Sequence, residues 1–435
     1  MPYLLNFAYL LLLAALSPWL LWQAWRTGKY REGWAAKLRG RVPHRQGNAR
    51  CLWLHAVSVG EVNLLAPIIE RFERRHPDWE IVISTTTQTG HALAQKRYAP
   101  RMVFYCPLDF TWAVRSALRD IRPDLLVLAE LELWPNLVRA ARLAGAKVAV
   151  INARLGEKSF RGYRRIGWLA RRALANIDLI AAQNGEYATR FLALGAPAEA
   201  VHVTGSIKFD GARTDRANSD TQRLARLAEI KPDDMVFLAG STQEPEESLA
   251  LDSYLALAPA HPMLQLILVP RHPERFDAVA ELLNRRGVRW QRRSRLEADR
   301  AASGVRILLV DAVGELGAWW GTAHIAFVGG SLGQRGGQNM IEPAAYGAAV
   351  SFGPNTWNFR DVAALLVQHQ AATIVSGGGE LTAFVEKCLT DPSFAPSLGQ
   401  AARDLVLAQQ GAADRTLALL DALLGPDSQS ARHAA

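Results

Sequence analysis

Cysteine is scarce in this chain of 435 residues, and none of Cys51, Cys106 and Cys388 stands in a Cys-x-x-Cys or Cys/His metal-ligand spacing. Three widely separated cysteines exclude a disulfide scaffold and favour a reducing compartment. The GxGxxG dinucleotide fingerprint, the GxxxxGK[ST] phosphate loop and the HExxH motif are also missing. Dehydrogenases, P-loop NTPases and zinc proteases therefore lose support, and neither a metal nor a cofactor is expected.

Charged side chains are absent before Arg26, and the segment Tyr3–Trp22 is almost entirely apolar. About 20 such residues in a helix span a hydrocarbon core, and tryptophans at its end suit the interface. A cleaved signal peptide is disfavoured, because no cationic residues precede the apolar run. Residues 1–25 are therefore predicted to form an uncleaved membrane anchor, either spanning the bilayer or inserted from one side.

Positive charge follows the anchor directly. The first 50 residues carry eight Lys or Arg against the single acid Glu32, so +7 of the net +9 lies there. A nucleic-acid-binding surface would spread its charge more widely, and nucleic acid is not expected as a partner. The cluster instead predicts contact with anionic lipids and a cytoplasmic location for the residues that follow.

From residue 51 onward, short apolar runs alternate with amphipathic helical segments, which is typical of parallel sheets built from βαβ units. The pattern lapses near residues 206–218 and then restarts. We therefore expect an α/β protein of two Rossmann-like domains facing a cleft, at 26–206 and 207–425, with a polar tail at 426–435. The expected strands are 52–58, 81–84, 125–129, 147–151, 179–182, 236–240, 264–269, 307–310, 325–328, 350–352 and 372–375.

Candidate site residues follow the strands of the first block, where open α/β sheets bind ligands. Ser58 and Glu61 have the spacing of a capping box, in which Glu61 would accept a bond from the Ser58 amide; the alternative is a general base. Glu130 ends a strand two residues before Glu132, either in a structural salt bridge or in a site. Lys208 either pairs with a nearby aspartate or reaches an anionic ligand.

The second block repeats this arrangement. Ser241 and Glu244 again have capping-box spacing, and Arg271 follows a strand between two prolines, where it could bind phosphate or pair with Glu274. The segment 329–337 has five glycines in nine residues, followed by a helix start at Asn339. Such a loop lets a ligand approach the backbone, and the following helix can receive an anion.

Seven segments follow one another in the order HAVSVGE, AELELWPN, NARLGEKSF, VTGSIKFD, STQEPEES, VPRHPERF and GGSLGQRGGQNMIEPAAYG. Together they resemble the 3-deoxy-D-manno-octulosonic acid (Kdo) transferase family of lipopolysaccharide biosynthesis. The resemblance runs from the anchor to about residue 420. It implies a metal-independent, inverting glycosyltransferase of GT-B fold that moves Kdo from CMP-Kdo to a lipid A precursor, lipid IVA, at the cytoplasmic face of the cell inner membrane.

The resemblance also implies roles for individual residues. Glu61 would be the general base, and Glu130 and Lys208 would stabilise the transition state. The implied CMP-binding positions are Pro270, Arg271, Val313, Gly314, Glu315, Asn339, Met340, Ile341 and Glu342. The chain departs from the family pattern where Gln243 and Gln338 stand in place of histidine and Pro245 in place of glycine, so a charged imidazole has no counterpart there.

Two further hypotheses remain open. One is another membrane-associated GT-B enzyme that uses a UDP-sugar, or a related nucleotide-sugar epimerase. The other is a non-catalytic, membrane-tethered module that binds a nucleotide or a glycolipid. The sequence does not indicate how many Kdo residues are transferred, and it does not indicate the oligomeric state.

Overall fold

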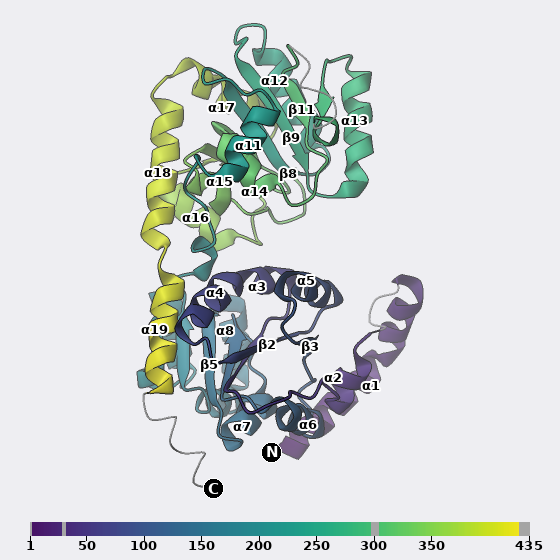
Figure 1. Ribbon diagram of the computed structural model, residues 1–435, viewed down its shortest axis with the longest axis vertical. Helices are drawn as coiled ribbons and strands as arrows, with labels where there is room; N and C mark the ends of the chain where they lie inside the picture. The colour runs from purple at the N-terminus through teal and green to yellow at the C-terminus, as the bar shows by residue number, and fades with distance from the viewer. Residues whose placement is uncertain (1, 28–31, 297–303, 426–435) are drawn as a thin grey trace. The chain divides into compact units, whose positions relative to one another are not determined.

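A computed structural model describes residues 2–27, 32–296 and 304–425 (Figure 1). The predicted polar tail lies outside this part of the chain, as do Lys29 and Arg31 of the basic cluster. The chain divides into two compact units. Unit 1 contains residues 1–211 and 410–435, and unit 2 contains residues 212–409.

Unit 1 is built on a seven-stranded parallel sheet of order β3-β2-β1-β4-β5-β6-β7. Its strands are β1 Cys51–His55, β2 Glu80–Thr85, β3 Val103–Tyr105, β4 Leu125–Ala129, β5 Lys147–Ala153, β6 Leu179–Ala182 and β7 Val201–Val203. Its helices are α1 Pro2–Thr27, α2 Trp34–Arg39, α3 Val59–Leu64, α4 Ala66–Arg75, α5 Gln88–Tyr98, α6 Thr111–Ile121, α7 Pro135–Leu143, α8 Glu157–Arg165, α9 Gly167–Leu174, α10 Gly185–Ala193 and α19 Ala412–Leu424, with 3₁₀ turns η1 Ala198–Ala200 and η2 Ile207–Phe209.

Unit 2 repeats the design with the order β10-β11-β9-β8-β12-β13-β14, again all parallel. Its strands are β8 Met235–Thr242, β9 Leu264–Pro270, β10 Gln291–Arg292, β11 Ile307–Leu309, β12 Ile325–Val328, β13 Ala349–Phe352 and β14 Thr373–Ile374. Its helices are α11 Ser219–Leu227, α12 Glu246–Leu257, α13 Phe276–Arg285, α14 Leu316–Trp319, α15 Ile341–Ala345, α16 Arg360–Gln368, α17 Gly378–Thr390 and α18 Phe394–Gln409, with 3₁₀ turns η3 Pro273–Arg275, η4 Arg293–Arg295 and η5 Trp320–Thr322.

Every expected strand is present within a few residues. The expectations missed β3, β7 and β10, which have only two or three residues each. In unit 1 the side chains of β1 alternate between two buried clusters, with Leu52 and Leu54 on one side and Cys51 and Trp53 on the other. Both faces of the sheet are therefore covered, as parallel sheets require.

The last helix, α19, belongs to unit 1, although residues up to 425 were expected in the second domain. Its leucines Leu417 and Leu420 are fully buried in the unit 1 core. The Asp210 carboxylate accepts hydrogen bonds from the Gly411 and Ala413 amides at its start, at 2.5 and 2.7 Å. Only the contacts of the helix, and not its place in the sequence, assign it to unit 1.

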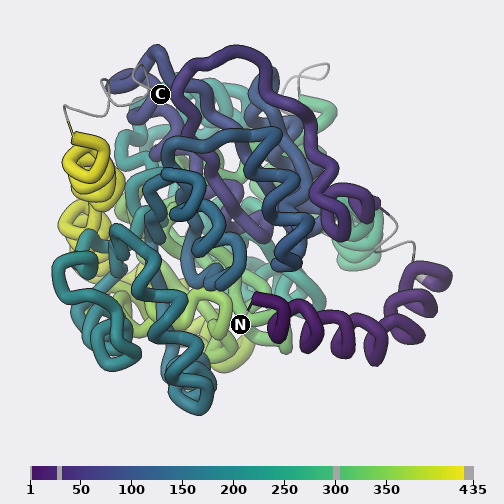
Figure 2. The backbone as a smooth tube through the Cα atoms, turned by 90° about the horizontal axis from the view of Figure 1, so that it is seen from below, coloured from purple at the N-terminus to yellow at the C-terminus, as the bar shows by residue number. Residues whose placement is uncertain are grey.

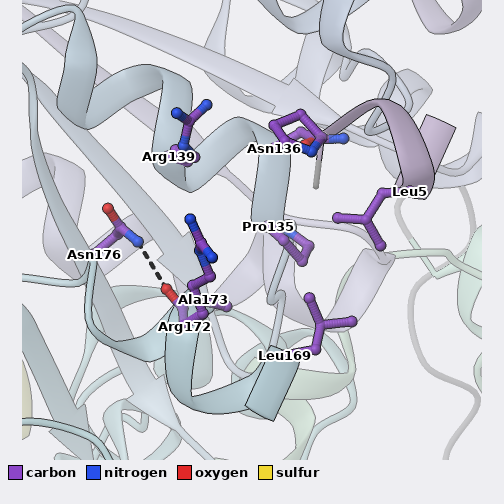
Figure 3. Close-up of a pocket in the computed structure, with 9 residues that line it drawn as sticks. Leu5, Pro135, Asn136, Arg139, Leu169, Arg172, Ala173 and Asn176 are labelled. Atoms are coloured by element: carbon purple, nitrogen blue, oxygen red, sulfur yellow. Dashed lines mark hydrogen bonds between the residues drawn. The ribbon is translucent and has the colours of Figure 1, made fainter. Parts of the chain in front are cut away.

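Helix α1 contacts the rest of unit 1 through its first turns, while its later part stands clear (Figures 1 and 2). The Asn6 side chain is buried and bonds twice to Thr111, and the Tyr9 hydroxyl donates to the Asp109 carboxylate at 3.1 Å. Figure 3 shows a small pocket here, with Leu5 across from Leu169 of α9. The polar groups of Asn6 and Tyr9 are thus bonded to the protein.

Candidate functional site

The strand order of unit 1 reverses between β1 and β4, and ligands of open α/β sheets bind at such a switch point. Glu61 lies in the first turn of α3, directly after β1. Its carboxylate accepts the Val57 amide at 2.8 Å and the Ser58 hydroxyl at 2.9 Å. The capping-box expectation was therefore wrong in detail, because the bonded amide belongs to Val57 and not to Ser58.

Glu130 directly follows β4 and has a φ of +58°, in the left-handed region, so the chain turns sharply there. Its carboxylate lies 2.9 Å from the Lys208 ammonium, and both side chains are about one-quarter exposed, at 24% and 27%. Lys208 comes from η2, nearly 80 residues later in the sequence. The aspartate pair considered for Lys208 does not form, because Asp210 instead caps α19.

Asn152, at the end of β5, holds the turn that carries Lys208. Its backbone has a φ of +51°, and its buried side-chain oxygen accepts the Ile207 amide at 3.0 Å. The Glu130 amide in turn donates to the Ile151 carbonyl at 2.9 Å. Sequence reasoning assigned Asn152 no role, although it begins the segment NARLGEKSF, which was among those that carried the resemblance.

The charges in this cluster influence one another. Burial raises the pKa of Glu61, the negative charge of Glu130 raises it further, and the hydrogen bonds and Lys208 oppose the rise. Burial and the charge of Glu61 also raise the pKa of Glu132 to about 7. Glu132 was noted in the sequence but not assigned to the site. The structure thus brings three carboxylates and one ammonium together at the switch point, a suitable setting for proton transfer.

We expect Glu132→Gln to stabilise the protein, and to do so more at pH 8 than at pH 5. A carboxyl whose folded pKa lies above its unfolded value favours folding while protonated, and this contribution is lost as pH rises from about 4.5 through 7. The gain in unfolding free energy at pH 8 should be on the order of 1–3 kcal/mol, allowing for partial solvent screening. Chemical unfolding at both pH values, with the exposed Glu70→Gln as control, measures it. A gain that does not depend on pH would contradict the prediction.

The predicted nucleotide-binding residues of unit 2 follow neighbouring strands. Pro270 ends β9, and the Arg271 amide donates to the Thr242 carbonyl of β8 at 3.0 Å. Among the described residues the Arg271 side chain makes no ion pair, and it is exposed. The pair with Glu274 considered from the sequence is therefore not formed.

The other predicted residues lie close to one another. Val313 and Gly314 are exposed, whereas the Glu315 carboxylate is held by the Arg293 guanidinium at 2.6 and 2.7 Å. The Asn339 side chain bonds to Glu342 at 3.0 Å and accepts the Ile341 amide at 3.1 Å, while Met340 and Ile341 are buried. A methyl group placed on Gly317 would lie 3.9 Å from the Glu342 carboxylate, so the segments 313–317 and 339–342 are neighbours.

A cavity of about 390 Å³ opens beside the glycine-rich loop. It is lined by Gln243, Glu244, Glu246, His272, Glu274, Arg275, Gly330, Gly333, Gln334 and Arg335, and so by none of the predicted nucleotide-binding residues. The side chains of Gln243 and Gln338 both lie near Gly330. The two positions that depart from the family pattern therefore meet at the start of this loop.

Two short motifs in unit 2 do not form the contacts or the site that their spacing is typical of. They are the capping-box spacing of Ser241 and Glu244 and the segment 329–333. The expected capping partner Glu244 is exposed and pairs with Arg275, and Glu246 bonds to the Gln243 amide instead. Residues 329–333 have the GxSxG spacing of a nucleophile elbow, but Ser331 is fully buried. Its hydroxyl donates to the Val328 carbonyl and accepts the Gly353 amide, so it is not an exposed nucleophile.

Known proteins resemble most of the chain. Residues 31–211 match the family model described as 3-deoxy-D-manno-octulosonic-acid transferase (kdotransferase). A 3-deoxy-D-manno-octulosonic acid transferase of Haemophilus influenzae is 34% identical, covering 86% of this chain and 88% of that protein. One of Bordetella pertussis is also 34% identical, covering 96% of this chain and 99% of that protein.

Solved structures support the fold. UDP-GlcNAc 2-epimerase of Neisseria meningitidis, bound to UDP-GlcNAc, has a TM-score of 0.58 and 15% identity, covering 85% of this chain and 99% of that one. A likeness of this degree bears on the fold, and it confirms the expected GT-B class. The family model and the two relatives lead to one conclusion: this chain is a glycosyltransferase that belongs to the 3-deoxy-D-manno-octulosonic acid transferase family.

Proposed function

We propose that the protein transfers Kdo from CMP-Kdo to a lipid A precursor, lipid IVA, with inversion at the anomeric carbon. The observation that carries the proposal is the cluster of Glu61, Glu130 and Lys208 at the switch point of unit 1, in a chain of the Kdo transferase family. These residues lie up to 147 positions apart in the sequence, and only the fold assembles them.

Glu61 acts as the general base in this proposal. It takes the proton from the acceptor hydroxyl as the hydroxyl oxygen attacks the anomeric carbon of Kdo and the bond to the CMP phosphate breaks. The Val57 and Ser58 bonds fix its carboxylate, and burial raises its pKa toward the range in which a carboxylate is an effective base. Glu130 and Lys208 supply fixed charges for the transition state, in which the sugar gains positive and the phosphate negative character.

Unit 1 takes the acceptor and unit 2 takes the donor in this proposal. In unit 2, the exposed Arg271 suits the phosphate of CMP, and the proposed contacts also include Pro270, the segment 313–315 and the segment 339–342. Because the Glu315 carboxylate is engaged with Arg293, we assign its contact to the backbone of the turn.

Transfer of labelled Kdo from freshly prepared CMP-Kdo to lipid IVA tests the proposal. Mass analysis of the product identifies the sugar and counts the residues added. A Kdo-bearing product is expected. The proposal would be contradicted if no product formed with active donor and several acceptors. If the protein also bound UDP in place of CMP, it would instead be assigned as an enzyme that uses a UDP-sugar.

We further propose that α1 anchors the enzyme at the cytoplasmic face of the inner membrane. Among the described residues it is the one helix long and apolar enough to cross a membrane, and little of it is buried. Its exposed side chains include Leu11, Leu12 and Trp25. The basic cluster that follows suits anionic headgroups.

Replacing both Leu11 and Leu12 by lysine is expected to release the protein from vesicles that contain anionic lipids. Each exchange costs about 3 kcal/mol in the centre of an apolar helix, so partitioning should fall by more than tenfold. Sedimentation with vesicles measures the bound fraction. Leu143→Lys, at an exposed leucine at the end of α7, is the matched control. Equal binding of the double variant and this control would contradict the anchor.

A further inference from the structure

Glu246, in the first turn of α12, is a buried carboxylate held by backbone amides. Its side chain is 1% exposed, and among the described residues it forms no ion pair. One oxygen accepts the Gln243 amide at 2.9 Å and the Gly330 amide at 2.7 Å. The other accepts the Ser331 amide at 2.9 Å and the Leu332 amide at 3.0 Å. Four bonds from N–H groups offset the cost of burying the charge.

The amides of three successive residues, 330–332, thus converge on one anion. Successive amides in this arrangement form a concave nest that in many proteins binds phosphate or another anionic ligand group. Here the nest is already filled by a side chain of the protein. The fit is close, because a methyl group on Gly329 would lie 2.7 Å from a Glu246 oxygen.

The held segment leads directly into the wall of the cavity. Glu246 and Gly330 line it, and so do Gly333, Gln334 and Arg335, which follow the three held amides. The neighbouring Glu247 binds Arg275 through two bonds of 3.1 Å, and Arg275 lines the same cavity. Glu246 and Glu247, adjacent residues of α12, therefore hold two parts of the cavity wall: the glycine-rich loop and Arg275.

We propose that Glu246 is a positioning residue of the donor site, holding the glycine-rich loop in the shape that binds the sugar nucleotide. This inference rests on the proposed function insofar as it takes the ligand of the cavity to be the donor. Because Glu246 fills the nest, the amides of 330–332 do not bind the phosphate or the sugar carboxylate of the donor. Those anionic groups are met by side chains instead, the phosphate by Arg271 as proposed above.

The first test is hydrogen exchange on the full-length protein, and it requires no activity. The amides of residues 330–332 should exchange slowly in the wild type. In Glu246→Gln they should exchange at least about tenfold faster, because the NH₂ group of glutamine is itself a donor and cannot accept their hydrogen bonds. The control is Asp234→Asn. Asp234 is also buried and accepts the Lys231 amide and the Gln265 side chain, but at the opposite end of β8. Fast exchange in the wild type, or unchanged exchange in Glu246→Gln, would overturn the proposal.

The second test is steady-state kinetics with CMP-Kdo. Glu246→Gln should raise the donor KM about tenfold or more while kcat at saturating donor falls less, whereas Asp234→Asn should leave the KM unchanged. Glu246→Asp keeps the charge and should give an intermediate KM, and it replaces the glutamine variant if that variant does not fold. A fall in kcat at constant KM, or equal KM changes in Glu246→Gln and Asp234→Asn, would overturn the positioning role. A wild type without transferase activity would overturn the proposed function but leave the exchange test intact.

Discussion

Glu61→Gln is expected to lower the rate of Kdo transfer by roughly 10²–10⁴-fold, the usual contribution of a general base. Glutamine has the same shape and can still accept the Val57 amide or the Ser58 hydroxyl, but it cannot take a proton. Because burial raises the pKa of Glu61, the wild-type rate should also fall as pH drops through that pKa. The measurement is kcat/KM against pH for the wild type and the rate of the variant at the optimum.

The matched control is Glu70→Gln, on the exposed face of the following helix α4, where Glu70 pairs with Arg74. It should transfer Kdo at the wild-type rate. Both variants should remain folded, since glutamine at position 61 removes a charge from a partly buried place. A folded Glu61→Gln variant that retains most of the activity would exclude Glu61 as the base.

Lys208→Met is expected to lower the transfer rate by about 10²–10³-fold, the scale of losing one preorganised charge that stabilises a transition state. It should also change the pH profile. Lys208 lowers the pKa of Glu61, so its removal raises that pKa, and the acid limb of kcat/KM moves to higher pH. A base that is active when deprotonated then needs a higher pH to work.

Lys147→Met is the control for this variant. Lys147 is an exposed lysine at the start of β5, whereas Asn152, which holds the turn of Lys208, lies at the end of that strand. Lys147→Met should change neither the rate nor the pH profile. Lys208→Arg keeps the positive charge beside Glu130, so its acid limb should stay close to the wild-type position even if its rate falls. An acid limb that moves equally in the methionine and arginine variants would show that shape, and not charge, accounts for the effect.

Much of the fold could be predicted because buried parallel strands carry a local signal. Runs such as Leu125–Ala129 and Ile325–Val328 are covered on both faces, so every residue in them is apolar. The short edge strand β10, Gln291–Arg292, lacks such a run and was missed, whereas the edge strand β3 was missed although it lies in the apolar run 102–106. The place of α19 was also missed, since an amphipathic helix shows which of its faces is buried but not which sheet buries it.

Some residues of the candidate site could likewise be selected from the sequence, whereas others were found only in the structure. Glu61 and Glu130 could be selected because each follows an expected strand, and Lys208 because it lies between apolar residues at the expected domain junction. The ion pair of Glu130 and Lys208 and the shared charge environment depend on strands that are distant in the sequence. Glu132 and Asn152 also lie in family-like segments, but they were assigned no role. Glu246 was hidden beside Glu244, which had the expected spacing, because the path of a turn cannot be deduced from spacing alone.

The apolar N-terminal helix, the two α/β blocks and the family could be read from the sequence alone, since each depends on composition, period or the order of motifs. Three features became visible only in three dimensions: the carboxylates that share a charge environment, the pairing of Lys208 with Glu130, and the filling of the nest of the glycine-rich loop by Glu246. Hydrogen bonds and charges act over a few ångströms in space. Residues far apart in the chain come within that range only when the sheets form.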